Sequence, residues 1–427
     1  MKFSIENLGC KVNAYEAEST AEILEEEGWT RVKPHEEADA VIIFTCAVTN
    51  TAAGKSRKAL HRARRENPDG ITVVAGCYVQ VDDEHLLDTA DIIVGTADKK
   101  RIPDLIRKFQ KDHQKIRDIP DLGSVSFDDL PYSVHDSKAR CDLKIQDGCN
   151  QFCSYCIIPY ARGRERSMNP DEAVRAAEEM SHQYREIVLT GIHTGRYGRE
   201  YGVSLAQLMK RMLDVIGDTR LRISSIEVTE VSDELIDLIR SDERVARFLH
   251  IPLQSGSDSV LKRMRRPYDT KYYYDRITRV RNAVPDISIS CDIMTGFPQE
   301  TDEEAEESEA FVRKCGFSFL HVFPFSPRKG TVAEKMPCQV SPEVKKQRTD
   351  RLLSLSRKLY DTWNMKQVGK EADIICEWVR DGYTTGHTSQ YVPVRINEEL
   401  VHGEKVHVLM TEYRNHQMYA RKTGKSE

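Results

Sequence analysis

Hydrophobic and polar stretches alternate along the first hundred residues. Apolar runs rich in Val, Ile and Phe indicate strands at 1–10, 39–46, 71–77 and 91–96. Polar stretches with helix-forming composition indicate helices between them, at 14–29 and 55–66. A strand, a helix and another strand in this order are typical of a doubly wound parallel sheet, in which ligands lie at the carboxyl ends of the strands. We therefore expect an N-terminal α/β domain whose functional edge is the one where these strands end.

A second alternating series follows a polar connector. Strands are indicated at 141–149, 186–195, 221–228, 248–256, 288–298 and 319–326. Helices are indicated between most of them, at 169–184, 204–216, 231–241, 270–283 and 301–314. Thr301 provides a capping hydroxyl for the last of these helices, and the acidic residues behind it suit the positive end of the helix dipole. Six strands with helices outside predict a partial (β/α)6 barrel, whose chemistry lies at the C-terminal face.

The C-terminal part of the chain has a different pattern. One long polar helix is indicated at 341–368, and short β-branched runs with turn residues follow it. They predict a small antiparallel β-barrel of the size used for RNA contact. The fold class is thus α/β with a terminal β-barrel, and 427 residues are too many for one core. We place the parts at 1–112 (N-terminal domain), 113–136 (connector), 137–366 (central barrel) and 367–427 (terminal barrel).

Composition limits the class of protein. Hydrophobic residues make up 39% and charged residues 31%, which is typical of folded domains rather than disordered chains. The sequence has no apolar run of bilayer length and no signal-peptide core, so we expect no membrane span and a cytoplasmic location. The net charge is −5, so binding to nucleic acid has to come from local basic patches such as 55–65 and 261–268. Either patch could equally be a solvated helix face.

Three of the 11 cysteines lie close together, Cys149, Cys153 and Cys156. Structural zinc takes four ligands, and no histidine lies near enough to complete this set. A 4Fe–4S cubane held by three thiolates leaves one iron open to a small molecule, and the spacing favours this kind of site over a purely structural set of thiols. Cys141 could be a fourth ligand, but a small buried cysteine is the simpler interpretation.

Cys10, Cys46 and Cys77 are far apart in sequence, but each follows a predicted strand of the N-terminal domain. We expect them to converge at the carboxyl edge of that sheet, although dispersed cysteines are also common in protein cores. The other four follow no pairing pattern and are predicted to be structural: Cys291, Cys315, Cys338 and Cys376.

The sequence Cys149-x3-Cys153-x2-Cys156, on the first predicted strand of the central barrel, resembles the signature of the radical S-adenosylmethionine enzymes. The resemblance implies that the open iron binds the amino and carboxyl groups of the methionine moiety. It also implies that an electron from the cluster yields a 5′-deoxyadenosyl radical, and that Tyr155 lies against the adenine.

Nearly the whole chain is similar to the methylthiotransferases of that superfamily, which join an N-terminal sheet with three cysteines, a radical core and a TRAM-like barrel. The resemblance implies that Cys10, Cys46 and Cys77 hold a second cluster with an open iron. The implied cofactors are two 4Fe–4S clusters and S-adenosyl-L-methionine. The cations expected to contact RNA on the terminal barrel are Arg414, Arg421, Lys422 and Lys425.

The segments "LGCKVN" at 8–13 and "IQDGCNQFC" at 145–153 are similar to one branch of this family. That branch methylthiolates C2 of N6-threonylcarbamoyladenosine in tRNA. The implied partners are the tRNA anticodon loop, an electron donor such as flavodoxin or ferredoxin, and a sulfur source. The alternatives are isopentenyladenosine in tRNA, an aspartate of a ribosomal protein, and an iron–sulfur RNA-binding protein without catalysis.

Secondary sites follow from the same resemblance. The loops at Gly191, Glu227 and Gln254 are implied to face the cofactor, and Glu227, interpreted as a strand end, could reach its ribose or amino group. Gln299 stands where the family usually has glycine, so the backbone there is expected to turn differently. No catalytic acid or base is assigned. The arginines of "RGRERS" (162–167) and the patch 261–268 are candidates for binding the threonylcarbamoyl carboxylate.

Overall fold

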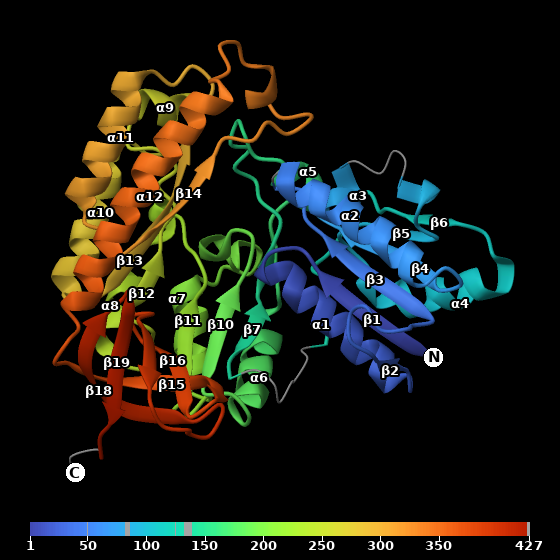
Figure 1. Cartoon of the computed structure of the whole chain (residues 1–427), viewed down its shortest axis with the longest axis horizontal. Helices are drawn as coiled ribbons and strands as arrows, with labels where there is room; N and C mark the ends of the chain where they lie inside the picture. Colours follow the sequence, from blue (N-terminus) through green and yellow to red (C-terminus); the bar gives the residue numbers. More distant parts are fainter. Residues whose placement is uncertain (49, 82–85, 124, 132–138, 425–427) are drawn as a thin grey trace. The chain divides into compact units, whose positions relative to one another are not determined.

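The computed structural model describes residues 1–48, 50–81, 86–123, 125–131 and 139–424 (Figure 1). The chain forms two compact units. The first consists of Met1–Ser133, Lys144–Met168 and Ser326–Glu334, and the second of Val134–Leu143, Asn169–Phe325 and Lys335–Glu427. The four-part division made from the sequence stays a prediction, and part of its connector, 124 and 132–136, lies outside the described residues.

A six-stranded sheet forms the centre of the first unit. Its strands are β1 (Lys2–Asn7), β2 (Thr30–Arg31), β3 (Ala40–Thr45), β4 (Ile71–Gly76), β5 (Ile92–Val94) and β6 (Ile116–Asp118). They are arranged in the order β2-β1-β3-β4-β5-β6, and every neighbouring pair is parallel. The doubly wound sheet is therefore confirmed. The sequence pattern did not indicate β2 and β6, which are only two and three residues long.

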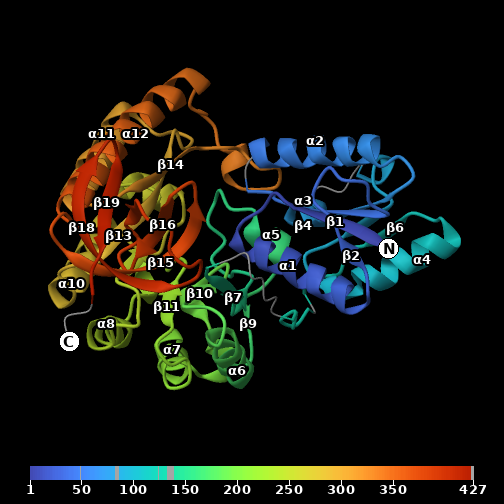
Figure 2. The ribbon, with the colours of Figure 1, turned by 60° about the horizontal axis from the view of Figure 1, so that its bottom comes forward.

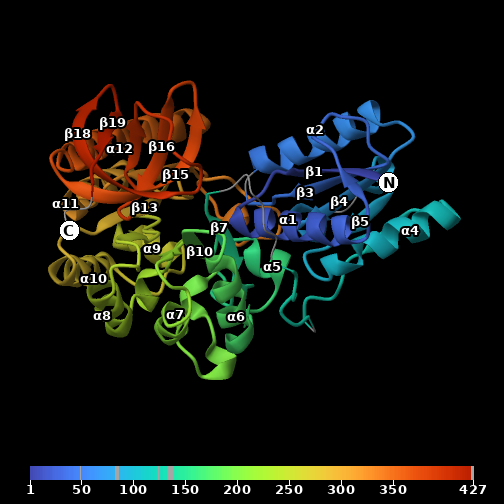
Figure 3. The same ribbon diagram turned by 90° about the horizontal axis from the view of Figure 1, so that it is seen from below.

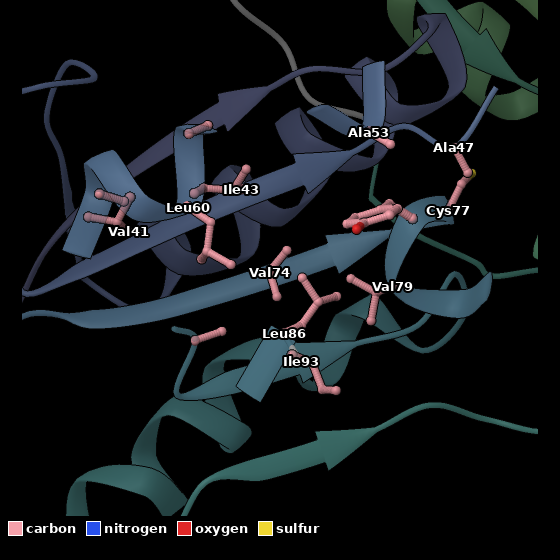
Figure 4. Packing of buried hydrophobic residues seen from close by; sticks show 14 of the residues in the cluster. Val41, Ile43, Ala47, Ala53, Leu60, Val74, Cys77, Val79, Leu86 and Ile93 are labelled. Atoms are coloured by element: carbon pink, nitrogen blue, oxygen red, sulfur yellow. The ribbon is translucent and has the colours of Figure 1, made fainter. Parts of the chain in front are cut away.

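Helices cover both faces of this sheet (Figure 3). Helices α1 (Lys11–Glu26) and α4 (Ile102–Asp112) pack on one face, where Leu24 and Ile106 meet Ile42 of β3. Helices α2 (Asn50–Glu66) and α3 (Cys77–Val81) pack on the other. Figure 4 shows this second layer, with Cys77 and Ala47 at one end of it.

The central segment of the chain also contributes to the first unit. Strands β8 (Gln146–Asp147) and β9 (Arg166–Ser167) pair in antiparallel fashion, and helix α5 (Ile158–Arg162) lies between them in sequence. Ile157 and Ala161 are buried in the same hydrophobic cluster as α2 and α3. Residues around the close-set cysteines are thus part of the N-terminal core.

The second unit contains the partial barrel. Its strands are β7 (Cys141–Lys144), β10 (Glu186–Thr190), β11 (Arg220–Ile223), β12 (Phe248–His250), β13 (Ser288–Thr295) and β14 (Leu320–Pro324). They form two three-stranded sheets, β11-β10-β7 and β12-β13-β14. Ile226 N donates to His250 O at 2.9 Å and so joins the two sheets. This arrangement confirms the predicted partial (β/α)6 barrel.

Helices surround these strands. They are α6 (Pro170–Ser181), α7 (Leu205–Leu213), α8 (Asp233–Ser241), α9 (Asp258–Arg263), α10 (Thr270–Ala283), α11 (Asp302–Cys315) and α12 (Pro342–Met365). All of them except α9 lie at nearly the predicted positions. Thr301 caps α11 as predicted, because its Oγ1 accepts a hydrogen bond from Glu304 N at 3.2 Å. Among the described residues, no helix has both the length and the apolar character needed to cross a membrane.

A closed five-stranded barrel ends the chain (Figure 2). Its strands are β15 (Glu371–Arg380), β16 (Tyr383–Thr388), β17 (Pro393–Ile396), β18 (Lys405–Arg414) and β19 (Gln417–Lys422). The order is β15-β16-β17-β19-β18, and β17 with β19 is a parallel pair. An odd number of strands cannot alternate in direction around a closed barrel, so one parallel pair is required. The predicted small barrel is confirmed with this one difference from a wholly antiparallel one.

A buried ion network fixes the terminal barrel on the central strands of the same unit. Glu186 accepts hydrogen bonds from Arg222 Nε at 2.9 Å and from Arg220 Nη1 at 3.2 Å. The same arginines donate to carbonyls of the barrel, Arg222 to Thr388 O at 3.1 Å and Arg220 to Asp373 O at 2.8 Å. Burial alone would raise the pKa of Glu186, but the arginines outweigh it and lower this pKa.

Candidate iron–sulfur and cofactor sites

The three dispersed cysteines lie at the carboxyl edge of the N-terminal sheet. Cys10 follows β1 as the N-cap residue of α1, where its thiol makes no capping hydrogen bond. Cys46 directly follows β3, and Cys77 directly follows β4. Burial raises the pKa of Cys77 to about 11, and the charges of Cys10 and Cys46 raise it as well. The three thiols are therefore electrostatic neighbours at one edge of one sheet.

Close backbone packing fixes these cysteines. Gly76 has φ +103°, and a Cβ there would lie 2.8 Å from Thr45 O. A Cβ on Gly9 would lie 2.1 Å from Asn13 Nδ2, and this same nitrogen donates to Thr45 O at 2.8 Å. Of the residues just before the three cysteines, Gly76 thus packs directly on Thr45, and Gly9 is linked to Thr45 through Asn13.

Cys149, Cys153 and Cys156 lie on the loop that follows β8, rather than on the strand itself. Gly148 starts this loop with φ +69°, and a Cβ there would lie 1.9 Å from Arg164 O. Cys149 N donates to Gly163 O at 3.1 Å, which joins the start of the loop to its far end. Cys156 N donates to Cys153 O at 3.0 Å. The loop is therefore closed on itself, and both cysteine sets belong to the first unit.

Six buried charged side chains lie between the two cysteine sets, and we call them the buried charge cluster: Glu16, Lys99, Lys144, Asp147, Arg162 and Arg166. Glu16 Oε1 is 2.7 Å from Lys144 Nζ and 2.8 Å from Arg162 Nη1. Asp147 Oδ2 is 2.8 Å from Lys144 Nζ and 3.1 Å from Arg166 Nη2. Burial would raise the pKa of Glu16 and of Asp147, but the neighbouring cations outweigh it and lower both. The two carboxylates thus remain ionised.

The donor chemistry of both sets fits iron–sulfur clusters. Each offers three thiols, which as thiolates are the usual ligands of such clusters. In the described part of the chain, no group of three or more His, Cys, Asp and Glu is arranged to hold a single metal ion. Burial raises the pKa of Cys46, and the positive charges of Arg162 and Arg328 partly oppose this rise. Positive charge beside the thiols suits an anionic, thiolate-bound group.

The predicted cofactor residues of the second unit follow strand ends or lie beside them. Gly191 directly follows β10, while Glu227 lies four residues beyond β11 rather than at its end. The Glu227 carboxylate is hydrogen-bonded to Arg266. Gln254 has φ +67° and bridges in parallel to Ile293 of β13. Tyr155 is partly exposed on the cysteine loop of the first unit. Their roles toward the cofactor stay predictions.

Only some of the proposed carboxylate-binding cations are accessible. Arg162 and Arg166 are buried and paired with acidic side chains, so they cannot reach a ligand in solvent. Arg164 is exposed, and its guanidinium lies 5.0 Å from the Phe152 ring centroid. In the patch 261–268, Lys262 and Arg265 are exposed, whereas its other arginines are paired with Glu227 and Glu304.

Gln299 adopts a left-handed backbone conformation, which glycine takes up more readily than other residues. Its φ is +65°, in the left-handed region, and its N donates to Cys338 O at 2.9 Å. A left-handed backbone costs a side-chain-bearing residue about 1–2 kcal/mol. The expectation that this turn differs from the turn of other family members stays a prediction.

The outer face of the terminal barrel carries an aromatic–arginine row that the sequence pattern did not indicate: Trp378, Thr385, Arg395 and Tyr419, opposite one another on four adjacent strands. Trp378 is 65% exposed, and Arg395 lies 3.8 Å from the Tyr383 ring centroid. The predicted cation Arg414 lies 4.7 Å from the Tyr419 ring centroid. Exposed rings beside arginines are typical of surfaces on which bases stack. The predicted contact Lys425 lies outside the described residues.

Two segments of the chain match known family models. Residues 143–312 match the Radical SAM superfamily, and residues 2–95 match the Uncharacterized protein family UPF0004. Among solved structures, the radical S-adenosylmethionine methyltransferase TsrM from Kitasatospora setae aligns with a TM-score of 0.60 and 14% identity, covering 78% of this chain and 77% of that one. This likeness concerns the fold alone.

Curated relatives match across almost the entire chain. Threonylcarbamoyladenosine tRNA methylthiotransferase MtaB of Bacillus subtilis is 39% identical over 91% of this chain and 88% of the relative. The protein of that name from Thermotoga maritima is 37% identical over 91% and 89%. The tRNA-2-methylthio-N(6)-dimethylallyladenosine synthase of Thermoanaerobacter pseudethanolicus is 32% identical over 96% and 90%. This chain belongs to the radical S-adenosylmethionine methylthiotransferase family.

Proposed function

We propose that the protein methylthiolates C2 of N6-threonylcarbamoyladenosine next to the anticodon of tRNA, giving the 2-methylthio derivative. The observation that carries this proposal is the end-to-end similarity to relatives of that name, together with both cysteine sets in one compact unit. Relatives named for dimethylallyladenosine are 31–32% identical, below the 37–39% of the Bacillus subtilis and Thermotoga maritima relatives, and a third relative named for threonylcarbamoyladenosine, from Aquifex aeolicus, is 32% identical. The substrate branch is therefore tested directly below.

Radical S-adenosylmethionine enzymes bind a 4Fe–4S cluster and S-adenosylmethionine. We assign that cluster to Cys149, Cys153 and Cys156, and a second 4Fe–4S cluster to Cys10, Cys46 and Cys77. When bound, these groups supply the electron, the 5′-deoxyadenosyl radical and the site for sulfur. The cysteine loop presents three thiols, because Gly148 and the Cys149–Gly163 hydrogen bond hold it closed. Tyr155, Gly191, Glu227 and Gln254 are proposed to bind S-adenosylmethionine.

The chemistry of the target explains why a radical is required. The hydrogen on C2 of adenine is neither acidic nor hydridic, so a positioned acid or base cannot remove it. The base must also leave the stack of the anticodon loop, and unpaired loops are where proteins can splay bases out. The aromatic–arginine row on the terminal barrel offers stacking faces and positive charge for such RNA. An external electron donor such as flavodoxin or ferredoxin, and a sulfur source, complete the proposal.

The substrate is tested by assaying three substrates in parallel with the reconstituted enzyme. These are tRNA with threonylcarbamoyladenosine, tRNA with isopentenyladenosine, and the ribosomal protein substrate. A pocket with donors placed for a carboxylate and a urea rejects an apolar analogue by a factor of about 10⁴ or more. We expect product only on the first tRNA, measured by mass analysis of the nucleosides. Preference for either other substrate contradicts the branch assignment but leaves the radical mechanism intact.

The two clusters are tested by separate triple replacements with Ala. Replacing Cys149, Cys153 and Cys156 should abolish release of 5′-deoxyadenosine, whereas replacing the N-terminal set should leave cleavage measurable and stop methylthiolation. Iron should fall by about half in each case, because each cluster is an independent cofactor. The control is C338A, because Cys338 is exposed and belongs to neither set. Methylthiolated product from the N-terminal variant rules out the second cluster.

A further inference from the structure

Arg162 is fully buried and every nitrogen of its guanidinium has a partner. It ends α5, in the segment that carries Cys149, Cys153 and Cys156. Nη1 donates to Glu16 Oε1 at 2.8 Å and to Asp147 Oδ1 at 3.2 Å, while Nη2 donates to Glu16 Oε2 at 3.1 Å and to Asn13. The remaining donor, Nε, points at sulfur: it donates to Cys77 Sγ at 3.2 Å. An arginine from one cysteine segment thus contacts a cysteine of the other set.

The buried charge cluster around Arg162 has more cations than acids. Among the described residues, four buried cations lie with three buried acids: Glu16, Asp147 and, at the edge, Asp128, whose carboxylate accepts a hydrogen bond from the backbone N of Lys99 at 3.4 Å. A buried charge without a counter-charge is costly, so an excess cation needs an anionic neighbour. The neighbour that Arg162 reaches beyond the carboxylates is the thiol of Cys77. A thiolate-bound cluster at this place supplies the missing negative charge.

We propose that Arg162 is a positioning residue of the iron–sulfur cluster assigned to Cys10, Cys46 and Cys77. Its Nε–H holds the Cys77 sulfur, and its charge favours the more negative, reduced form of that cluster. Hydrogen bonds to ligand sulfurs and nearby charge are among the levers by which proteins set the potentials of iron–sulfur clusters. The segment with the radical-generating cysteines therefore also tunes the second cofactor. This inference rests on the N-terminal cluster of the proposed function.

A comparison of two Lys substitutions distinguishes a purely structural role of Arg162 from the proposed contact with the Cys77 sulfur. Lys at this position keeps the positive charge but places a methylene where Nε–H was, so the hydrogen bond to sulfur is lost. Arg166 provides the matched control. It is buried in the same cluster and pairs with Asp147 at 3.1 Å, and its hydrogen bonds to the described residues go to oxygens. R162K and R166K thus perturb the same charges, but only the first removes the contact with Cys77.

The experiment uses the full-length chain with Cys149, Cys153 and Cys156 replaced by Ala, which isolates the N-terminal cluster. The background, R162K and R166K proteins are reconstituted with iron and sulfide and titrated with dithionite under EPR. We expect R162K to shift the midpoint potential to more negative values and to alter the EPR signal, whereas R166K matches the background. An R162K potential equal to that of the background overturns the proposal, and so does an equal shift in R166K.

Two further results distinguish a failure of the N-terminal cluster assignment from a failure of the role proposed for Arg162. If the background protein binds no iron, the proposed N-terminal cluster is wrong, and the role of Arg162 is wrong with it. If R162K does not fold, as judged by its circular dichroism melt, the titration is repeated with N13S. Asn13 accepts from Nη2 of Arg162 and donates to the backbone oxygen of Thr45. N13S should produce a smaller shift in the same direction, and an unchanged potential there contradicts the proposal.

Discussion

Replacement of Glu186 by Gln tests how the terminal barrel is held on the central strands. The carboxylate is 2% exposed and faces three arginines, with Arg222 Nη2 at 2.9 Å, Arg220 Nη1 at 3.2 Å and Arg140 Nη1 at 3.7 Å. The amide of Gln removes the negative charge and turns an NH2 group toward these donors. Arg220 and Arg222 then remain buried with no counter-ion of comparable strength, although their bonds to barrel carbonyls persist.

The expected cost follows from this burial. Removing one partner of a buried ion pair destabilises a protein by about 3–5 kcal/mol. The control is Asp237→Asn, which breaks the ion pair between Asp237 and Arg240 at 3.0 Å, whose side chains are 64% and 60% exposed, respectively. An exposed pair of this kind contributes less than about 1 kcal/mol. The two variants thus change the same kind of interaction at very different burial.

Urea unfolding followed by tryptophan fluorescence measures the difference. A chain of two units need not unfold in one transition, so the signal must come from the second unit alone. Trp363 and Trp378 lie in that unit, and a Trp29→Phe background removes the signal of the first. We expect Glu186→Gln to lower the free energy of unfolding by about 3–5 kcal/mol.

The pH dependence provides a second check. The pKa of Glu186 is lowered in the folded state, so its contribution is present above the unfolded value of about 4.3 and is lost as the pH falls below it. The gap between wild type and Glu186→Gln should therefore narrow in acid. The reasoning is refuted if Glu186→Gln lowers the free energy of unfolding by less than about 1 kcal/mol at neutral pH. It is also refuted if the difference in this free energy between wild type and variant does not change in acid.

Substitutions at three other positions test the cysteine loop, the left-handed turn and the barrel surface. Gly148→Ala should abolish iron binding by the loop, because the new Cβ would lie 1.9 Å from Arg164 O; iron analysis against Gly54→Ala, where nothing lies within 4 Å, measures this. Gln299→Gly should raise the melting temperature and Gln299→Val should lower it, since φ is +65° and a β-branched residue is disfavoured there; the reverse order contradicts the assigned turn. Arg395→Ala should weaken tRNA binding and reduce its salt slope by about 1, while S-adenosylmethionine cleavage without tRNA persists; an unchanged slope in filter binding contradicts the RNA contact.

Periodicity predicted the long elements well because each buries one continuous apolar face. The helix expected at 270–283 is α10 (Thr270–Ala283), and the one expected at 301–314 is α11 (Asp302–Cys315). Short elements such as β2 and α9 were not predicted from the sequence. The two residues of β2 make one strand repeat, and the six residues of α9 make less than two helical turns, so neither shows a clear periodicity. The single parallel pair in the barrel follows from closure, which is a property of the assembled sheet and not of any segment.

The sequence predicted only part of the candidate site. The cysteines could be placed at strand ends, because the strands themselves have clear patterns. The buried charge cluster could not be predicted, because Glu16 lies in a Glu-rich helix whose sequence is typical of a solvent-exposed surface. Its partners Lys144 and Arg162 are 128 and 146 residues away. Arg162 and Arg166 were expected to bind a ligand, because a single sequence does not reveal which charged residues are buried.

The distribution of the first unit over three stretches of chain has a consequence for biosynthesis. Glu16 leaves the ribosome 146 residues before Arg162, an interval of about 7–30 s at ordinary rates of translation. Lys99 is the first of its cationic partners to be synthesised, and Glu16 lacks both Lys144 and Arg162 for most of that time. The edge that carries Cys10, Cys46 and Cys77 can be completed only after the radical motif has been synthesised. If these cysteines hold the proposed second cluster, we expect iron delivery to them to follow the synthesis of Arg162.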